Sequence, residues 1–194
     1  MAHLRETNRC NNVALAAVLA IIGSSEGVLA NPPSHTGSLS LCRDLAGHST
    51  PDGSVWLEGE EKGEVVCVVD GDTFDVRLDR TRQIVRARIW GVDCPESSAN
   101  EKCTQKGTAA CAAENVAGKR ATRETQAILS ANRRVTLEPP YKRNGNRKLT
   151  YVRLRDGIDL GRKLIEKCLC VAGYQHARKA EYEKVARACG KRGK

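Results

Sequence analysis

Acidic side chains gather in two short motifs whose residue types suit metal-assisted hydrolysis. Asp70 and Asp72 stand in V-V-D-G-D-T, and Asp93 and Glu96 stand in G-V-D-C-P-E. Hard cations such as Ca²⁺ bind several oxygen ligands, and carboxylates are the strongest of these. A carboxylate that is left off the metal can activate or position a water molecule. The two motifs together therefore favour a metal site with a general base beside it.

Two arginines accompany these carboxylates. Arg88 lies five residues before Asp93, and Arg147 lies in the basic segment R-N-G-N-R-K. A scissile phosphate needs a metal and an arginine fork beside it. An Asp-Gly pair alone is most often only a turn, and a lone arginine on a strand is usually solvated. The ordered set of D-G-D-T followed by R-x4-D-x-P-E is much more specific than either part.

The hydrophobic pattern predicts five strands that position these motifs. Residues 65–69 form a β-branched apolar run, and residues 73–78 and 84–90 alternate between apolar and polar side chains. Turn signals at Asp70-Gly71 and over 79–83 separate them, so antiparallel folding brings the motifs together at the strand ends. We expect two further strands, over 134–138 and 149–154. Pro139-Pro140 should end the first of these, and a basic loop over 141–148 should join the two.

Helical spacing predicts helices over residues 112–131, 158–167 and 177–189. Five strands with about three packed helices indicate an α+β fold, a five-stranded OB-type β-barrel. This architecture hosts many functions, so it does not by itself define one.

The N-terminal segment has the features of a secretory signal peptide over residues 1–30. Arg5 and Arg9 precede a ten-residue apolar stretch, and Val28-Leu29-Ala30 fits a cleavage site. Ten apolar residues cannot span a bilayer as a helix, although an uncleaved anchor is the alternative. We expect a flexible extension over 31–62 and one folded domain over 63–194. The prediction is a secreted or periplasmic monomer without membrane attachment after signal cleavage.

Eight cysteines follow the expected leader, and an even number there indicates an oxidising compartment with disulfides. Eight cysteines allow 105 full pairings, so the connectivity is not readable. Cys103 and Cys111 would close a short loop and are the best candidates for one bridge. Cys168 and Cys170 resemble a metal-binding pair, but no second cysteine pair or nearby histidine pair completes a tetrahedral site.

The charge of the chain favours a polyanionic partner. The formal net charge is +9 over 194 residues, and the first thirty residues contribute none of it. Positive charge alone also serves solubility. Phosphate contacts nevertheless supply much of the affinity for nucleic acids, so DNA or RNA is the expected partner.

The motifs resemble those of the thermonuclease family, the staphylococcal-nuclease-like enzymes. The matching segments are V-V-D-G-D-T (68–73), R-I-W-G-V-D-C-P-E (88–96) and N-R-K-L-T-Y-V-R-L-R-D-G (146–157), and the likeness covers roughly residues 63–190. The resemblance implies a nuclease domain that hydrolyses phosphodiester bonds of DNA and RNA. It also implies Ca²⁺ as the cofactor and products with 3′-phosphate ends.

The resemblance further implies a set of metal ligands. Asp72 and Asp93 would bind Ca²⁺ directly, the backbone carbonyl of Cys94 would be another ligand, and Asp70 would lie in the outer shell. The family usually has Thr or Ala at the position of Cys94. A carbonyl ligand can come from any residue, but the thiol could instead be tied up in a disulfide.

The same resemblance implies the residues that act on the phosphate. Glu96 would be the general base or position water, and Arg88 and Arg147 would bind the phosphate. The residue before Arg147 is Asn146, where the family usually has glycine, so the geometry of this loop departs from the pattern. Tyr174 is a weak match to a nucleotide-stacking tyrosine of the family.

Two other classes of function remain open from the sequence. One is a non-catalytic nucleic-acid-binding barrel, and the other is a secreted interaction protein that binds acidic polymers. Retention of the complete set of acidic residues and arginines favours catalysis. The chain has four histidines in all, too few and too poorly placed for a histidine-metal finger nuclease or a two-histidine ribonuclease.

Overall fold

The structure is a computed structural model that describes residues 37–44, 51, 54, 55, 57–98, 101–173 and 176–192. The expected signal peptide, much of the expected extension and Tyr174 lie outside the described residues.

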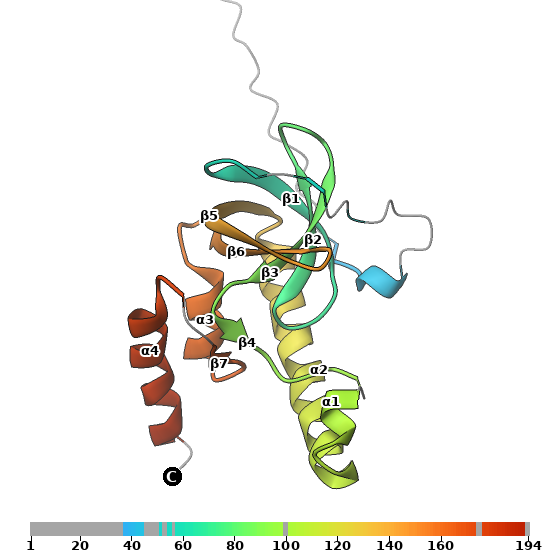
Figure 1. The fold of residues 1–194 in the computed structure, drawn as a ribbon, viewed down its shortest axis with the longest axis vertical. Helices are drawn as coiled ribbons and strands as arrows, with labels where there is room; N and C mark the ends of the chain where they lie inside the picture. The colour runs from blue at the N-terminus through green and yellow to red at the C-terminus, as the bar shows by residue number, and fades with distance from the viewer. Residues whose placement is uncertain are drawn as a thin grey trace, which may run out of the picture. The chain divides into compact units, whose positions relative to one another are not determined.

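Five strands close into a barrel in the order β1-β2-β3-β6-β5, which Figure 1 shows. Strands β1 (Glu61–Val68), β2 (Thr73–Leu78) and β3 (Ile84–Ile89) form an antiparallel meander. Strands β5 (Arg134–Asn144) and β6 (Arg147–Leu154) form a hairpin. The barrel closes because β5 pairs antiparallel with β1 and β6 pairs parallel with β3. The predicted α+β fold with a five-stranded barrel is confirmed, and it is consistent with the OB type.

The core of the barrel follows the alternation that the sequence shows. In a strand, successive side chains point to opposite faces, so every second residue enters the core. On β2 and β3 the inward residues are all 0–1% exposed: Phe74, Val76, Leu78, Val85, Ala87 and Ile89. On β6 the same rule turns Arg147, Leu149 and Arg153 outward and buries Lys148, Thr150, Val152 and Leu154, whereas Tyr151 shares the outer face and is buried beneath Arg178.

The hairpin of β5 and β6 differs from the prediction. The expected end of the strand at Pro139-Pro140 and the expected basic loop over 141–148 are wrong, because β5 runs through to Asn144 and β6 begins at Arg147. The register between the strands shifts between Glu138 and Lys142. A bulge of this kind accommodates prolines that cannot donate to the ladder.

The three expected helices are present with shifted ends. They are α2 (Thr108–Ala131), α3 (Leu160–Glu166) and α4 (Lys179–Arg192). Helix α3 packs against both α4 and β6. Four short elements were not expected: η1 (Cys42–Asp44), α1 (Glu101–Thr104), and the two-residue strands β4 (Val92–Asp93) and β7 (Val171–Ala172), which pair with each other.

The described part of the expected extension contributes to the barrel. Strand β1 starts at Glu61, and Leu39, Val55 and Leu57 are buried in the hydrophobic core. Leu41 forms a bridge with Val68 at the end of β1.

Four disulfides link the eight cysteines of the described residues. The predicted bridge between Cys103 and Cys111 is confirmed. The others join Cys42 to Cys67, Cys94 to Cys170, and Cys168 to Cys189. The last two pairings remove Cys168 and Cys170 from any metal site. Four disulfides are typical of oxidising compartments. Among the described residues, no helix has the length and apolar character needed to cross a bilayer.

Candidate functional site

The start of β2 and the end of β3 bring Asp72 and Arg88 together. The antiparallel register pairs Thr73 with Arg88, and the Ile89 N–H donates to the Asp72 carbonyl at 2.9 Å. The Arg88 Nη1 atom lies 2.9 Å from Asp72 Oδ1. The side chain of Asp72 is 2% exposed and that of Arg88 is 21% exposed, so this ion pair is largely shielded from water.

The same arginine also holds Asp93. After β3 the chain turns at Gly91, whose φ of 80° is a conformation that favours glycine, and Asp93 follows on β4. The Arg88 Nη2 atom donates to Asp93 Oδ1 at 3.2 Å. The Asp93 side chain is 42% exposed. One guanidinium therefore bridges a buried and an accessible carboxylate, a contact that the motif spacing did not specify beyond bringing these groups together.

Asp72 is held by neutral donors as well as by Arg88. The Thr73 hydroxyl donates to Oδ1 at 2.8 Å, and the Cys94 N–H donates to Oδ2 at 3.1 Å. Asp70 accepts from the Asp72 N–H at 3.1 Å. Burial, and then the charge of Asp70, raise the pKa of Asp72 to about 7, although Arg88 and the hydrogen bonds lower it. Burial is therefore the dominant influence on the pKa of this carboxylate.

The turn over residues 94–96 is fixed from two sides. The disulfide from Cys94 to Cys170 ties it to the residue before β7. On the other side, Gly118 of α2 lies so close to the carbonyls of Pro95 and Glu96 that a Cβ would overlap them. Glycine is therefore required at this contact, and helix and turn support each other.

Glu96 and Arg147 are not bonded to the rest of the site. Within the described chain, no hydrogen bond or ion pair joins either side chain to Asp72, Arg88 or Asp93. Glu96 is partly buried three residues after Asp93. Arg147 donates to Asn144 Oδ1 at 3.1 Å, across the turn of the β5–β6 hairpin.

The parallel pairing of β3 with β6 sets the distance between the two arginines. Arg147 lies opposite Arg86, and Arg88 lies opposite Leu149. Arg88 and Arg147 are thus on neighbouring strands and on the same outer face. Strand spacing and rise put their Cα atoms roughly 8 Å apart. Two arginine side chains at this separation can reach the same phosphate.

The donor set suits a hard cation only in part. Asp72 and Asp93 are carboxylates, Cys94 contacts Asp72 through its N–H, and Ca²⁺ prefers oxygen ligands such as carboxylates and carbonyls. The carboxylates of Asp72, Asp93 and Glu96 do not form a tight group in the described structure. The group of three that does have ligand atoms within 4.8 Å is Cys42, Cys67 and Asp75. Its cysteines are joined in a disulfide, so they offer no thiolate to a metal.

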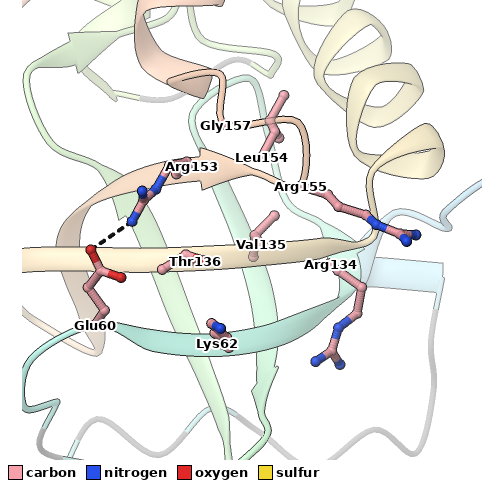
Figure 2. A pocket seen from close by; sticks show the side chains of 9 residues that line it. All are labelled: Glu60, Lys62, Arg134, Val135, Thr136, Arg153, Leu154, Arg155 and Gly157. Carbon is pink, nitrogen blue, oxygen red and sulfur yellow. Dashed lines mark hydrogen bonds and ion pairs between the residues drawn. The ribbon is translucent and has the colours of Figure 1, made fainter.

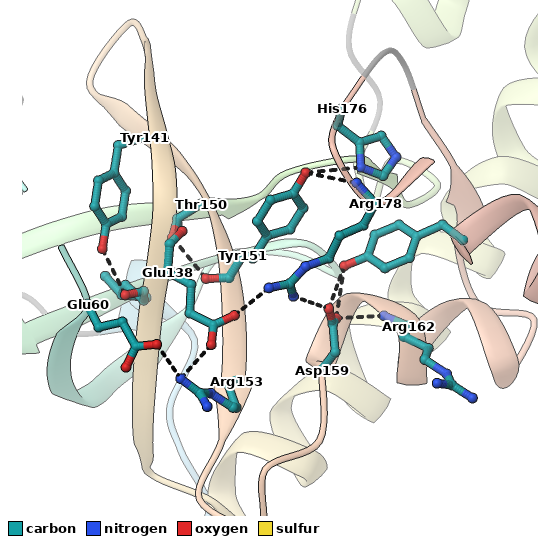
Figure 3. Close-up of polar contacts among 12 residues, drawn as sticks. Glu60, Glu138, Tyr141, Thr150, Tyr151, Arg153, Asp159, Arg162, His176 and Arg178 are labelled. Carbon is teal, nitrogen blue, oxygen red and sulfur yellow. Dashed lines mark hydrogen bonds and ion pairs between the residues drawn. The ribbon is translucent and has the colours of Figure 1, made fainter. Parts of the chain in front are cut away.

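Sequence reasoning missed a cluster of polar side chains that anchors the start of α4, which Figure 3 shows. Arg178 donates to Glu138 of β5 at 2.6 Å, is paired with Asp159, and lies 4.1 Å from the centre of the Tyr151 ring. The Tyr182 hydroxyl donates to Asp159 at 2.9 Å. Up to forty positions separate these partners in sequence. No motif marks them, so no local signal could have found them.

No protein-family model matches the chain, and the search of curated proteins finds no match either. The assignment of function therefore depends on the residues and geometry of the site.

Proposed function

We propose that the protein is a Ca²⁺-dependent endonuclease that hydrolyses phosphodiester bonds of DNA, RNA or both, and leaves 3′-phosphate ends. The observation that carries this proposal is the bridge from Arg88 to Asp72 and Asp93. It brings a guanidinium, which can bind a phosphate, and two carboxylates, which can bind a metal, to one edge of the barrel. The thermonuclease-like motifs supply the same residues in the same roles.

Asp72, Asp93 and the Cys94 carbonyl would hold the metal. The raised pKa of Asp72 supports this assignment, because a buried carboxylate short of positive charge is stabilised by a bound cation. When bound, Ca²⁺ would polarise a phosphate oxygen and stabilise the charge that develops in the transition state.

The remaining residues act on the substrate. Arg88 can exchange its two carboxylate partners for phosphate oxygens, and Arg147 can bind the same phosphate from the neighbouring strand. Both then stabilise negative charge in the transition state. Glu96 orients the attacking water or accepts its proton, because it follows Asp93 in the same rigid turn and is partly accessible.

One observation favours a second candidate, a barrel that binds nucleic acid without cleaving it. Both Nη atoms of Arg88 contact carboxylates, those of Asp72 and Asp93, and Glu96 and Arg147 are not bonded to this group in the described structure. If substrate does not open this bridge, binding by the basic surface remains and hydrolysis does not.

Cleavage assays in Ca²⁺ and in chelator separate the two candidates. The protein is produced under oxidising conditions so that its disulfides form, and it is incubated with single-stranded DNA and with RNA. The proposal predicts shortened products with 3′-phosphate ends in Ca²⁺ and intact strands in chelator. Binding of both strands without cleavage, at any Ca²⁺ concentration, would assign the protein to the second class.

A further inference from the structure

A groove on the outer face of β1, β5 and β6 carries a second concentration of positive charge. It has a volume of about 380 Å³, and Figure 2 shows the side chains that line it. Four of them are cations and one is a carboxylate: Lys62, Arg134, Arg153, Arg155 and Glu60. Lys62 lies near the start of β1, whereas Asp70 and Asp72 follow its end. The groove is therefore separate from the candidate site.

Strand register explains why these cations meet. Lys62 pairs with Thr136, and Thr136 pairs with Arg153, so one row crosses all three strands. Because side chains alternate between faces, residues two positions away share the outer face. Arg134 and Arg155 therefore lie on the same face as this row.

Carboxylates hold two of the four cations in place. Arg153 lies 2.7 Å from Glu60 and 2.6 Å from Glu138, and Arg134 is paired with Asp79. A guanidinium has five N–H donors, so such a pair leaves donors for another anion. The oriented arginines can then bind a phosphate at little further cost in side-chain entropy.

The other two cations have no such partner. Lys62 and Arg155 are exposed, and neither side chain has a hydrogen bond or ion pair with any residue that the structure describes. The positive charges of Lys62 and Arg155 are therefore not balanced by a direct carboxylate partner, and a phosphate group could pair with them.

We propose that this groove binds the phosphodiester backbone of a nucleic acid strand beyond the bond that is cleaved. The inference rests on the proposed function for the identity of the ligand. Its own support is the pair of cations in the groove that have no carboxylate partner among the described residues, Lys62 and Arg155, and the presence of three arginines, whose planar forks match phosphate oxygens.

The geometry of β6 sets the length of strand that can use the groove. Arg147 and Arg153 lie on the outer face of β6, six positions apart, which corresponds to about 20 Å. Tyr151, which shares this face, is covered by Arg178, so a strand must pass around it; at about 3.4 Å per nucleotide, at least about six nucleotides separate the two contacts. A trinucleotide at the candidate site does not reach the groove, whereas a strand of about 16 nucleotides does.

The experiment measures the salt dependence of binding, in chelator so that no strand is cut. A variant with Lys62→Ala and Arg155→Ala is compared with the wild type and with a control that carries Lys184→Ala and Arg187→Ala. The control removes two exposed cations from α4. Each phosphate contact contributes about 0.7 to the slope of log K against log salt for single strands. The groove variant should lose about 1.4 of this slope on the long strand and bind it roughly tenfold more weakly near 0.15 M salt.

For the wild type, the slope of log K against log salt should be steeper for the long strand than for the trinucleotide. In the groove variant, the difference between these two slopes should be smaller. Equal slopes for the groove variant and the α4 control would overturn the proposal. So would loss of binding to heparin or to anionic vesicles without loss of oligonucleotide binding, because the groove would then serve another polyanion. Binding without cleavage in Ca²⁺ would overturn the proposed function alone. Failure of the wild type to bind either strand at low salt would overturn both.

Discussion

Arg88 Nη1 lies 2.9 Å from Asp72 Oδ1 and joins the end of β3 to the start of β2. The carboxylate is almost fully buried, and the guanidinium contacts it from the accessible side. Because the same guanidinium also binds Asp93, it holds both expected metal ligands in one place. A change at Arg88 is therefore expected to affect both the stability of the barrel and the proposed metal site.

Replacement of Arg88 should reduce both stability and activity. Arg88→Ala leaves the buried Asp72 without its cation, which should lower the free energy of unfolding by about 1–3 kcal/mol. Loss of one group that stabilises the transition state should reduce kcat about 10²–10³-fold. Denaturant unfolding and single-turnover cleavage measure the two effects.

Arg147→Ala is the matched comparison. Arg147 bonds to Asn144 in a hairpin turn, so its removal should change the unfolding free energy by less than about 0.5 kcal/mol. The cleavage rate should still fall by a comparable factor, because Arg147 is expected to bind the phosphate. A normal rate in Arg147→Ala would remove this residue from the site.

The metal-free protein should lose stability as the pH rises from about 4 to 7. Burial raises the pKa of Asp72 to about 7 in the folded state, well above the usual range of an aspartate, so the folded state binds more protons than the unfolded state between these pH values. Stability then falls by up to about 1.4 kcal/mol per pH unit. Thermal unfolding in chelator at several pH values tests this. Asp72→Asn should remove this dependence of stability on pH. Addition of Ca²⁺ should raise the stability of the wild-type protein at pH 7.

Gly118→Ala should disturb the site through helix packing. The added Cβ would overlap the Glu96 carbonyl, so α2 and the turn over 94–96 must move apart. We expect a loss of about 1–3 kcal/mol in stability together with weaker Ca²⁺ binding. Val116→Ala changes an exposed residue of the same helix and should be nearly neutral. Calorimetric titration with Ca²⁺ compares the two, and equal affinities would contradict the packing argument.

The Cys94–Cys170 and Cys168–Cys189 disulfides should differ in their effect on Ca²⁺ binding. Removal of the Cys94–Cys170 bridge by double alanine substitution should cost about 2–4 kcal/mol and also weaken Ca²⁺ binding, because Cys94 supplies both an N–H to Asp72 and an expected carbonyl ligand. Removal of Cys168–Cys189 should also reduce stability but leave Ca²⁺ affinity close to the wild type. Similar Ca²⁺ affinities for the two variants would show that the first bridge does not position the ligands.

The sequence predicted the parts of the fold that follow local pattern. Alternation on β2 and β3 gave their inward faces, and the turn after β1 placed Asp72 near Asp93. The sequence predicts that β5 ends at Pro139, because a proline pair normally ends a strand. The strand continues because its register against β6 shifts at the prolines, and this shift depends on the partner strand rather than on local sequence. Strands β4 and β7 have two residues each, too few to show a period.

For the candidate site too, the sequence predicts the residues of local motifs but not the contacts between distant parts of the chain. Motif spacing located the two carboxylates and Arg88. It could not show that Cys94 pairs with Cys170, seventy-six positions away, because eight cysteines allow 105 pairings. It also could not show the contact of Gly118 with the turn, since only the packing of α2 brings these backbones together.

The central claim is that Glu96, three residues after Asp93 in the turn over 94–96, acts as the general base or positions water in the hydrolytic step. Its most direct test is the single-turnover rate of Glu96→Gln on single-stranded DNA and RNA in saturating Ca²⁺. Glu58→Gln, at the opposite end of β1 from Asp70, is the control. The account predicts a 10²–10⁴-fold lower rate for Glu96→Gln, on the order of an acid–base group, and a rate within a few-fold of wild type for the control. A Glu96→Gln rate within a few-fold of wild type would contradict it.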